Sequence, residues 1–226
     1  MVDTLVLGTS AARREGSSPF IPTKIIMKQR HHVIYVPGIL DDKLKVQSSL
    51  VRLWRFRGVR GHCHEIPWAG DEAFEPKLQR LLDRIDYYKA QGHLVSLIGA
   101  SAGASGVLNA YVERRDSIAG LIYICAKVNA PETVSAKTYA RNPAFKTSML
   151  SLQKNLKKLT LADKAKMHSY YSPADGVVPY EATVIRGVPE VVLPSLHHGR
   201  AILYSLSLGA RGLLAPLKKQ AFENNT

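Results

Sequence analysis

Short apolar runs rich in β-branched residues alternate with longer segments of helical periodicity along most of the chain. This alternation is typical of a parallel sheet covered by helices, so the pattern predicts the α/β class. Two of the runs lie near the amino terminus, and six follow at intervals. We expect strands at residues 4–8, 23–28, 32–36, 59–67, 93–99, 118–125, 167–172 and 190–195.

The segments between these runs predict amphipathic helices. Pro76 and Gly92 mark the ends of one of them, because proline suits the first turn of a helix and glycine the position just past its end. We expect helices at residues 43–56, 75–91, 102–115 and 201–214.

Residues 131–166 lack any strand signal and predict two or three helices inserted before the sheet resumes. Such an insertion could form a small helical cap over a site. The 226 residues, 46% of them hydrophobic, suit one substantial core, so we expect a single domain over residues 1–226.

The start of the chain has an acidic residue where a secretory signal requires basic ones, and no apolar stretch approaches the roughly 20 residues that span a bilayer. We therefore expect a cytoplasmic protein. Cys63 and Cys125 are too few for a disulfide framework or a four-ligand zinc site, and both are interpreted as buried thiols. His62 and His64 flank Cys63, but two imidazoles without a third ligand make a poor metal site. We expect neither a metal nor another cofactor.

The net charge of +13 favours contact with nucleic acid, anionic membranes or acidic substrates. However, the basic residues of 43–61 and 152–168 are interleaved with apolar residues at helical spacing, which is typical of solvated helix faces. We therefore expect no nucleic-acid partner, while contact of these basic faces with a membrane surface stays open.

A G-x-S-x-G motif, Gly99 to Gly103, lies where the predicted strand 93–99 meets the helix that follows. A serine in a tight turn is the plainer interpretation of five such residues. At a strand-to-helix turn, however, a sharp elbow lifts the hydroxyl of Ser101 above the sheet, and the small residues around it leave the crowded turn clear. Ser101 is therefore a candidate nucleophile.

In that arrangement an acid and then a histidine must follow the serine along the chain. Asp175 lies in the loop after the predicted strand 167–172, although in isolation an ordinary Asp-Gly turn is the plainer interpretation of it. Asp116 and Asp163 also follow Ser101, but neither stands at the carboxyl end of a strand. For the base, His198 follows the last strand and precedes a glycine and a helix.

Two further choices complete the candidate site. His197 is the alternative to His198 as base, because both stand in the same loop. The oxyanion of an acyl transfer needs backbone donors, one of them the amide after the nucleophile, here that of Ala102. The second candidate is the amide of Ile39, which follows Pro37-Gly38 at the end of an apolar strand.

These motifs, "PGI" at 37–39, "GASAG" at 99–103, "SPADGVVP" at 172–179 and "LHHG" at 196–199, resemble those of the α/β-hydrolase superfamily. The resemblance implies a mainly parallel sheet of about seven or eight strands with helices on both faces. It also implies a triad of Ser101, Asp175 and His198. The commonest esterase pattern has a His-Gly pair where this chain has Pro37-Gly38.

The resemblance favours a serine hydrolase that cleaves a small carboxylic ester through an acyl-enzyme, as carboxylesterases and lipases do. Thioesterase, amidase, peptidase and acyltransferase activities share the triad and stay open. A dehalogenase of this fold would need a carboxylate in place of Ser101. The alternative outside enzymes is a non-catalytic domain of the same fold that binds a small ligand or an anionic partner.

Overall fold

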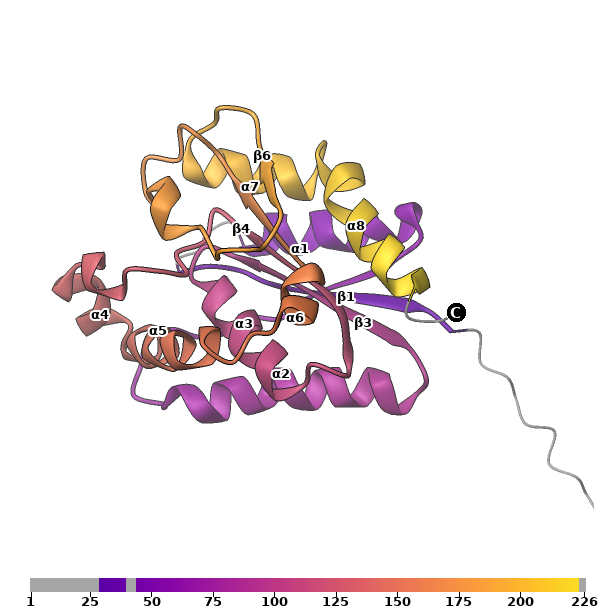
Figure 1. Ribbon diagram of the computed structural model, residues 1–226, viewed down its shortest axis with the longest axis horizontal. Helices are drawn as coiled ribbons and strands as arrows, with labels where there is room; N and C mark the ends of the chain where they lie inside the picture. The colour runs from indigo at the N-terminus through magenta and orange to yellow at the C-terminus, as the bar shows by residue number, and fades with distance from the viewer. Residues whose placement is uncertain (1–28, 40–43, 224–226) are drawn as a thin grey trace, which may run out of the picture.

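The computed structural model describes residues 29–39 and 44–223, and its centre is a sheet of six parallel strands (Figure 1). Their order across the sheet is β2-β1-β3-β4-β5-β6, so the first strand along the chain lies inside the sheet. The strands are β1 (His31–Val36), β2 (Arg60–Cys63), β3 (Leu94–Ala100), β4 (Ile118–Ile124), β5 (Met167–Tyr171) and β6 (Glu190–Val192).

Helices cover both faces of this sheet (Figure 1). Helices α1, α7 and α8 lie over one face, and α2, α3 and α5 lie over the other. In the described ranges no helix is both long and apolar enough to cross a lipid bilayer. The helices are α1 (Leu44–Leu53), α2 (Phe74–Ala90), α3 (Gly103–Glu113), α4 (Ala136–Arg141), α5 (Pro143–Leu156), α6 (Leu161–Ala165), α7 (His198–Leu206) and α8 (Ala210–Glu223). Three short 3-10 helices are η1 (Trp54–Arg57), η2 (Pro131–Thr133) and η3 (Tyr180–Ala182).

The central strands are apolar on both sides because helices cover both sides. All seven residues of β4 are buried, and β3 is buried from its second residue onward. The sequence of such a strand is a continuous apolar run, without the alternation of apolar and polar residues that a strand with one exposed face has. This makes the central strands easy to recognise in the sequence. Two apolar cores result, one on each face of the sheet.

The described part of the sheet has fewer strands than the sequence predicts for the whole chain. It has six described strands where seven or eight were expected, and the two expected at residues 4–8 and 23–28 lie outside the described residues. The prediction of a strand at 59–67 was too long, because β2 ends at Cys63. After a last ladder hydrogen bond from the His64 amide to the Tyr35 carbonyl (2.8 Å), the chain leaves the sheet before Pro67, which has no amide hydrogen to donate.

The prediction of one closing helix over residues 201–214 was also wrong, because α7 and α8 are separate helices. The Ser207 hydroxyl donates to the carbonyl of Leu203 at 2.6 Å, and the Gly209 amide donates to that of Tyr204 at 2.8 Å. A Cβ on Gly209 would lie 3.1 Å from the Tyr204 carbonyl oxygen, so this tight turn favours glycine.

Residues 131–166 form η2, α4, α5 and α6, as the missing strand signal predicted. Buried polar contacts hold α5 against α3. The hydroxyls of Ser105 and Ser148 lie 2.7 Å apart, and the Asn109 amide donates to the Ser148 carbonyl at 2.9 Å. Asn155 in turn donates to Oδ1 of Asn109 at 2.8 Å. Helix α5 is therefore fixed in the helical layer by satisfied buried groups.

Candidate active site

Ser101 occupies a sharp turn between β3 and α3. Its φ angle is +50°, a left-handed conformation that is unfavourable for a residue with a Cβ, and its amide donates to the Ile124 carbonyl at 3.0 Å. A Cβ on Gly99 would lie 2.6 Å from Cα of Ala104, and one on Gly103 would lie 2.2 Å from the Val36 carbonyl oxygen. The two glycines therefore let the backbone pass close to its neighbours while Ser101 is held at the end of β3.

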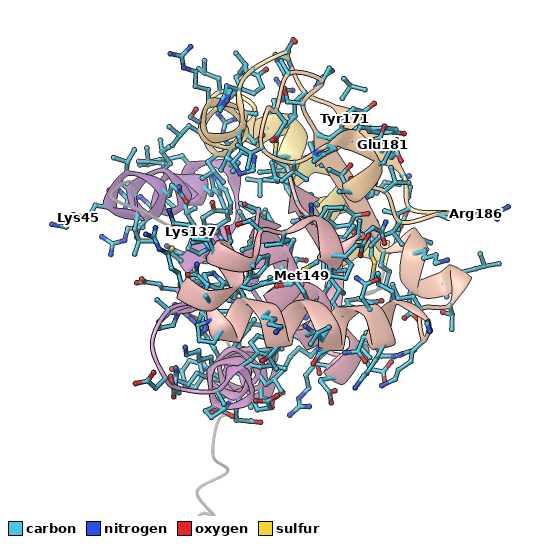
Figure 2. All side chains as sticks on the ribbon, turned by 90° about the vertical axis from the view of Figure 1, so that its left-hand side faces the viewer. Lys45, Lys137, Met149, Tyr171, Glu181 and Arg186 are labelled. Carbon is cyan, nitrogen blue, oxygen red and sulfur yellow. The ribbon has the colours of Figure 1, made fainter. Side chains whose placement is uncertain are left out.

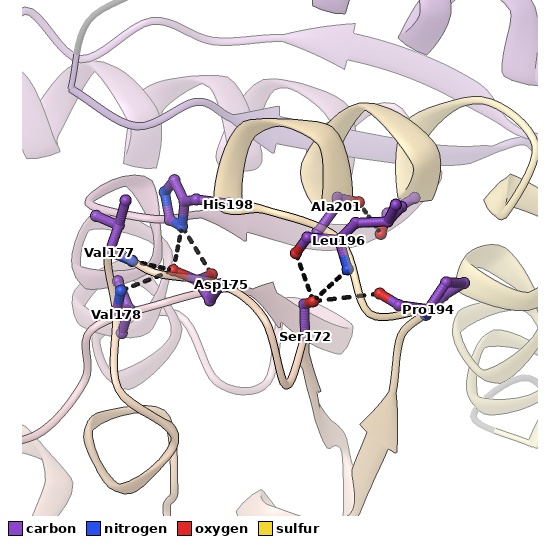
Figure 3. Close-up of polar contacts among 9 residues, drawn as sticks. Ser172, Asp175, Val177, Val178, Pro194, Leu196, His198 and Ala201 are labelled. Carbon is purple, nitrogen blue, oxygen red and sulfur yellow. Dashed lines mark hydrogen bonds and ion pairs between the residues drawn. The ribbon is translucent and has the colours of Figure 1, made fainter.

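Asp175 and His198 form a hydrogen-bonded pair at the same sheet edge (Figure 3). Nδ1 of His198 lies 2.8 Å from Oδ2 and 2.9 Å from Oδ1 of Asp175. Oδ1 also accepts hydrogen bonds from the amides of Val177 (2.9 Å) and Val178 (2.7 Å). Burial raises the pKa of Asp175, but the hydrogen bonds from His198 and the two amides outweigh it and hold this pKa below its ordinary value. The carboxylate is therefore ionised at neutral pH.

A second set of bonds fixes the loops that carry this pair (Figure 3). The Ser172 hydroxyl donates to the Leu196 carbonyl at 2.6 Å and accepts from the Leu196 amide at 3.0 Å. The His198 amide donates to the carbonyl of Asp175 at 2.9 Å. The loop after β5 is thus fastened to the loop after β6, which brings residues 23 positions apart into contact.

The two candidate bases have different environments. His198 is 14% exposed and bonded to Asp175, whereas His197 is exposed to solvent. A Cβ on Gly176 would lie 2.9 Å from Nε2 of His197, so that ring packs over the glycine of the Asp175 loop. The structure brings His198, and not His197, to the carboxylate of Asp175.

The segment after β1 lies directly against Ser101. A Cβ on Gly38 would lie 2.8 Å from Cβ and 3.3 Å from Oγ of Ser101, so a side chain there would obstruct the serine. The two candidate oxyanion donors flank this contact. The amide of Ile39 follows Gly38, and the amide of Ala102, a buried residue, follows Ser101. Within the ranges that the structure covers, neither the Ile39 amide nor the Ala102 amide has a protein acceptor.

Ser101 shares its sheet edge with the Asp175–His198 pair, because the carboxyl ends of parallel strands meet at one edge. The Ser101 amide bonds to β4, and the amide of Cys125, the next residue after β4, bonds to the Tyr170 carbonyl of β5 at 2.8 Å. Among the described residues, Ser101 Oγ forms no hydrogen bond.

Cys125 lies beside this pair, whereas the sequence identified it only as a buried thiol. Its sulfur, a carboxylate oxygen of Asp175 and a ring nitrogen of His198 all lie within 4.8 Å of one another. Burial, together with the charge of Asp175, raises the pKa of the Cys125 thiol, which therefore stays protonated. Sulfur, oxygen and nitrogen donors at this spacing are ligands that Zn²⁺ accepts, but both oxygens of Asp175 are already hydrogen-bonded to His198.

A cavity of about 310 Å³ opens next to the Gly38–Ser101 contact. Its wall is mainly apolar, with the indole of Trp68 packed edge-on against Phe145 of α5 at a centroid distance of 5.7 Å. Asn142 contributes to the wall from the end of α4. The lining residues are Pro37, Gly38, Ile39, Leu44, Glu65, Ile66, Pro67, Trp68, Ala69 and Asn142.

The other described histidines form no hydrogen bond to Asp175 or His198. His62 bonds to His32 and Tyr88, and His64 stands at the end of β2. In the part of the chain that the structure describes, only the Cys125, Asp175 and His198 group brings three donors of the types His, Cys, Asp and Glu close enough to hold a metal ion.

No protein-family model and no curated protein sequence matches the chain. Solved structures of lipases and esterases do match it. The esterase Est1E from Butyrivibrio proteoclasticus is 16% identical, with a TM-score of 0.61, over 87% of this chain and 90% of that one. A metagenome-derived lipolytic enzyme of the LipS and LipT study is 14% identical, with a TM-score of 0.60, over 84% and 94%. A monoacylglycerol lipase from Paleococcus ferrophilus is 13% identical, with a TM-score of 0.51, over 77% and 93%. The likeness shows that the chain has the α/β-hydrolase fold.

Proposed function

We propose that this chain, which folds as an α/β hydrolase, is a serine hydrolase that cleaves carboxylic esters. The observation that carries the proposal is the bond from His198 Nδ1 to Asp175 at 2.8 Å, at the sheet edge where Ser101 follows β3. The names of the structural neighbours, which are lipases and esterases, support ester hydrolysis over other acyl transfers.

The proposed reaction uses the two nitrogens of His198 differently. An ionised carboxylate only accepts hydrogen bonds, so Nδ1 carries the proton that Asp175 accepts, and Nε2 is left as the base. Nε2 takes the proton of the Ser101 hydroxyl as Oγ attacks the acyl carbon. The imidazolium then protonates the leaving alcohol as the ester bond breaks. Water, deprotonated by the same nitrogen, then attacks the acyl carbon. The bond from that carbon to Oγ breaks, and the imidazolium returns its proton to Oγ, which releases the acid and restores Ser101.

The negative charge of the tetrahedral intermediate needs donors that are already in place. The amides of Ile39 and Ala102 are the proposed donors, supported by the closeness of Gly38 to Ser101 and by their lack of a protein acceptor in the described ranges. A bound oxyanion would satisfy both.

The apolar cavity beside Gly38 is the proposed site for the acyl group. Its volume of about 310 Å³ suits a small acyl chain or a single ring. Residues 131–166 act in this proposal as a cap, supported by Asn142, which lines the cavity, and by Phe145, which packs behind the lining residue Trp68.

The test is labelling with a fluorophosphonate probe, which reacts with an activated serine. We expect the wild type to be labelled and to hydrolyse p-nitrophenyl acetate or butyrate, and Ser101→Ala to lose the label and about 10⁴-fold or more of the rate. Ser105→Ala, one helical turn further on, is the matched control and should keep the label. If the folded wild type neither reacts with the probe nor hydrolyses any acyl ester, the proposal is wrong and a non-catalytic binding domain becomes the better explanation. Parallel assays with thioester and anilide substrates rank the remaining acyl chemistries.

A further inference from the structure

The outer side of α1 and η1 combines basic and apolar side chains. Residues 43–64 contain no acidic residue but six basic ones: Lys43, Lys45, Arg52, Arg55, Arg57 and Arg60. On the same segment Val46, Leu53 and Phe56 are 52%, 51% and 75% exposed. Large apolar side chains of this exposure, flanked by cations, are not explained by packing among the described residues.

Helical spacing arranges these side chains in two adjacent rows. Lys45 and Arg52 are seven residues apart, as are Val46 and Leu53, and residues seven apart lie on the same side of a helix. The opposite side of α1 is buried through Gln47 and Val51. Figure 2 shows Lys45 extending from α1 away from the rest of the molecule.

The apolar part of this surface continues onto the turn between α7 and α8. The indole nitrogen of Trp54 donates to the Leu206 carbonyl at 3.0 Å, which joins η1 to the end of α7. Leu208, two residues later, is 82% exposed. A hollow of about 380 Å³ lies between the two elements, lined by Leu50, Leu53, Trp54, Phe56, Arg57, Leu206 and Ser207.

The basic part continues in the other direction. A wider hollow of about 700 Å³ on the other side of Phe56 is lined in part by Arg30, Arg55 and Arg60. The guanidinium carbon of Arg55 lies 4.7 Å from the centroid of the Phe56 ring. Within residues 29–39 and 44–223, none of these arginines forms an ion pair.

We propose that this surface docks the protein on an anionic lipid membrane. We call it the basic apolar surface and define it as Lys45, Val46, Arg52, Leu53, Arg55, Phe56, Arg57 and Leu208. Cations at the level of lipid phosphates and apolar side chains that enter the acyl boundary are the two components of interfacial binding. Nucleic acid would use the arginines but leaves no role for the aliphatic side chains of Val46, Leu53 and Leu208, so charge and apolarity together favour lipid.

The η1 end of the basic apolar surface lies away from the candidate active site. Arg55 and Phe56 line the same hollow as Arg30, which precedes β1, and Arg60, which begins β2, so this end lies at the amino edge of the sheet. Lys45 and Val46, at the start of α1, lie nearer the carboxyl edge. Ser101 and the Asp175–His198 pair lie at the carboxyl edge. Membrane binding can therefore be measured without reference to ester hydrolysis.

The experiment is co-sedimentation of the full chain with vesicles of phosphatidylcholine alone and of phosphatidylcholine mixed with phosphatidylglycerol. We expect binding at least about tenfold tighter to the anionic vesicles and weakened by added salt. The variant Arg52→Gln, Arg55→Gln, Arg57→Gln should bind about 100-fold more weakly, from about fivefold for each cation removed. The variant Leu53→Ser, Phe56→Ser should lose about tenfold or more with the net charge unchanged.

The matched control removes three exposed cations from the opposite helical layer: Lys154→Gln, Lys157→Gln, Lys158→Gln. It has the net charge of the arginine variant and should bind within about threefold of the wild type. Thermal melts verify that every variant folds, which is expected because all substituted side chains are exposed. Failure of the folded wild type to bind anionic vesicles overturns the proposal, as does an equal loss in the lysine control. Full binding by the Leu53→Ser, Phe56→Ser variant would instead indicate a purely electrostatic surface, such as one for nucleic acid.

Discussion

The carboxylate of Asp175 holds the imidazole of His198 by its Nδ1 atom, at 2.8 Å, and both side chains are largely buried at 5% and 14% exposure. The same carboxylate accepts hydrogen bonds from the backbone amides of Val177 and Val178, so its position is set by the loop after β5. Orientation of the ring is therefore determined before any substrate binds.

Asp175→Asn should slow ester hydrolysis by about 10³- to 10⁴-fold without unfolding the chain. The asparagine oxygen can still accept the Val177 and Val178 amides, but its amide group would face Nδ1 as a donor and favour the wrong tautomer of His198. The measurement is kcat for a p-nitrophenyl ester beside a thermal melt. Asp116→Asn, at an acid that also follows Ser101, is the control and should leave kcat within about twofold. A full rate for folded Asp175→Asn would remove Asp175 from the mechanism.

The variants Gly103→Ala and Gly212→Ala form a matched pair that tests how crowded the turn around Ser101 is. A Cβ on Gly103 would lie 2.2 Å from the Val36 carbonyl oxygen and 2.4 Å from that of Pro37, whereas one on Gly212 meets nothing within 4 Å. Gly103→Ala should lower the free energy of unfolding by about 1–3 kcal/mol through overpacking. Gly212→Ala, inside α8, should raise it by about 0.5–1 kcal/mol through helix propensity. Urea unfolding of both variants checks the pair, and equal effects would contradict this account.

The strand-and-loop pattern predicted the α/β class and put Ser101, Asp175 and His198 each after an apolar strand. In a parallel sheet the carboxyl ends of the strands lie at one edge. The closeness of Asp175 and His198 could therefore be expected from the sequence, because each follows a predicted strand. The contact of Cys125 with this pair could not be predicted, because it depends on β4 and β5 being neighbours and on the turn after β4.

The errors have local causes. Pro67 shows that the ladder cannot continue through it, but the earlier end of β2 at Cys63 depends on the register with β1, which the apolar pattern of residues 59–67 does not reveal. The break between α7 and α8 depends on a serine that bonds back to its own helix and on one glycine, inside a segment whose apolar spacing is uniformly helical. In each case local hydrogen bonds to backbone groups, and not the apolar pattern, decided where the element ends.

The two cysteines should resist alkylation in the folded protein. Burial raises the pKa of Cys63 to about 11, and burial with the Asp175 charge raises that of Cys125 as well. Only the thiolate reacts, so at neutral pH iodoacetamide should modify neither residue until denaturant is added. Mass spectrometry of treated samples measures this. Hydrolytic activity should survive the treatment, and rapid native labelling of Cys125 would show that the site opens to solvent.

A group of histidines at the amino edge of the sheet should make stability depend on pH. Nδ1 of His32 lies 2.9 Å from Nε2 of His62, and the His32 ring stacks on His93 with centroids 4.8 Å apart. Burial comes first among the causes that lower the pKa of both His32 and His62 to about 4, followed by repulsion from neighbouring charges. Between about pH 4 and 6.5, both rings therefore stay neutral in the folded protein, whereas an ordinary histidine binds a proton there.

The sign of the effect follows from where the protons bind. Between about pH 4 and 6.5 the unfolded chain binds protons at these histidines and the folded chain does not, so the free energy of unfolding falls as the pH falls through this range. Above about pH 6.5 the folded and unfolded chains bind equally few protons at these histidines, so the histidines add no pH dependence to the free energy of unfolding. Thermal melts should show Tm falling by several degrees from pH 6.5 to 4.5, and His62→Gln should reduce that slope. The exposed His197, replaced by Gln, is the control and should keep the wild-type slope; an unchanged slope in His62→Gln would exclude His62 as its source.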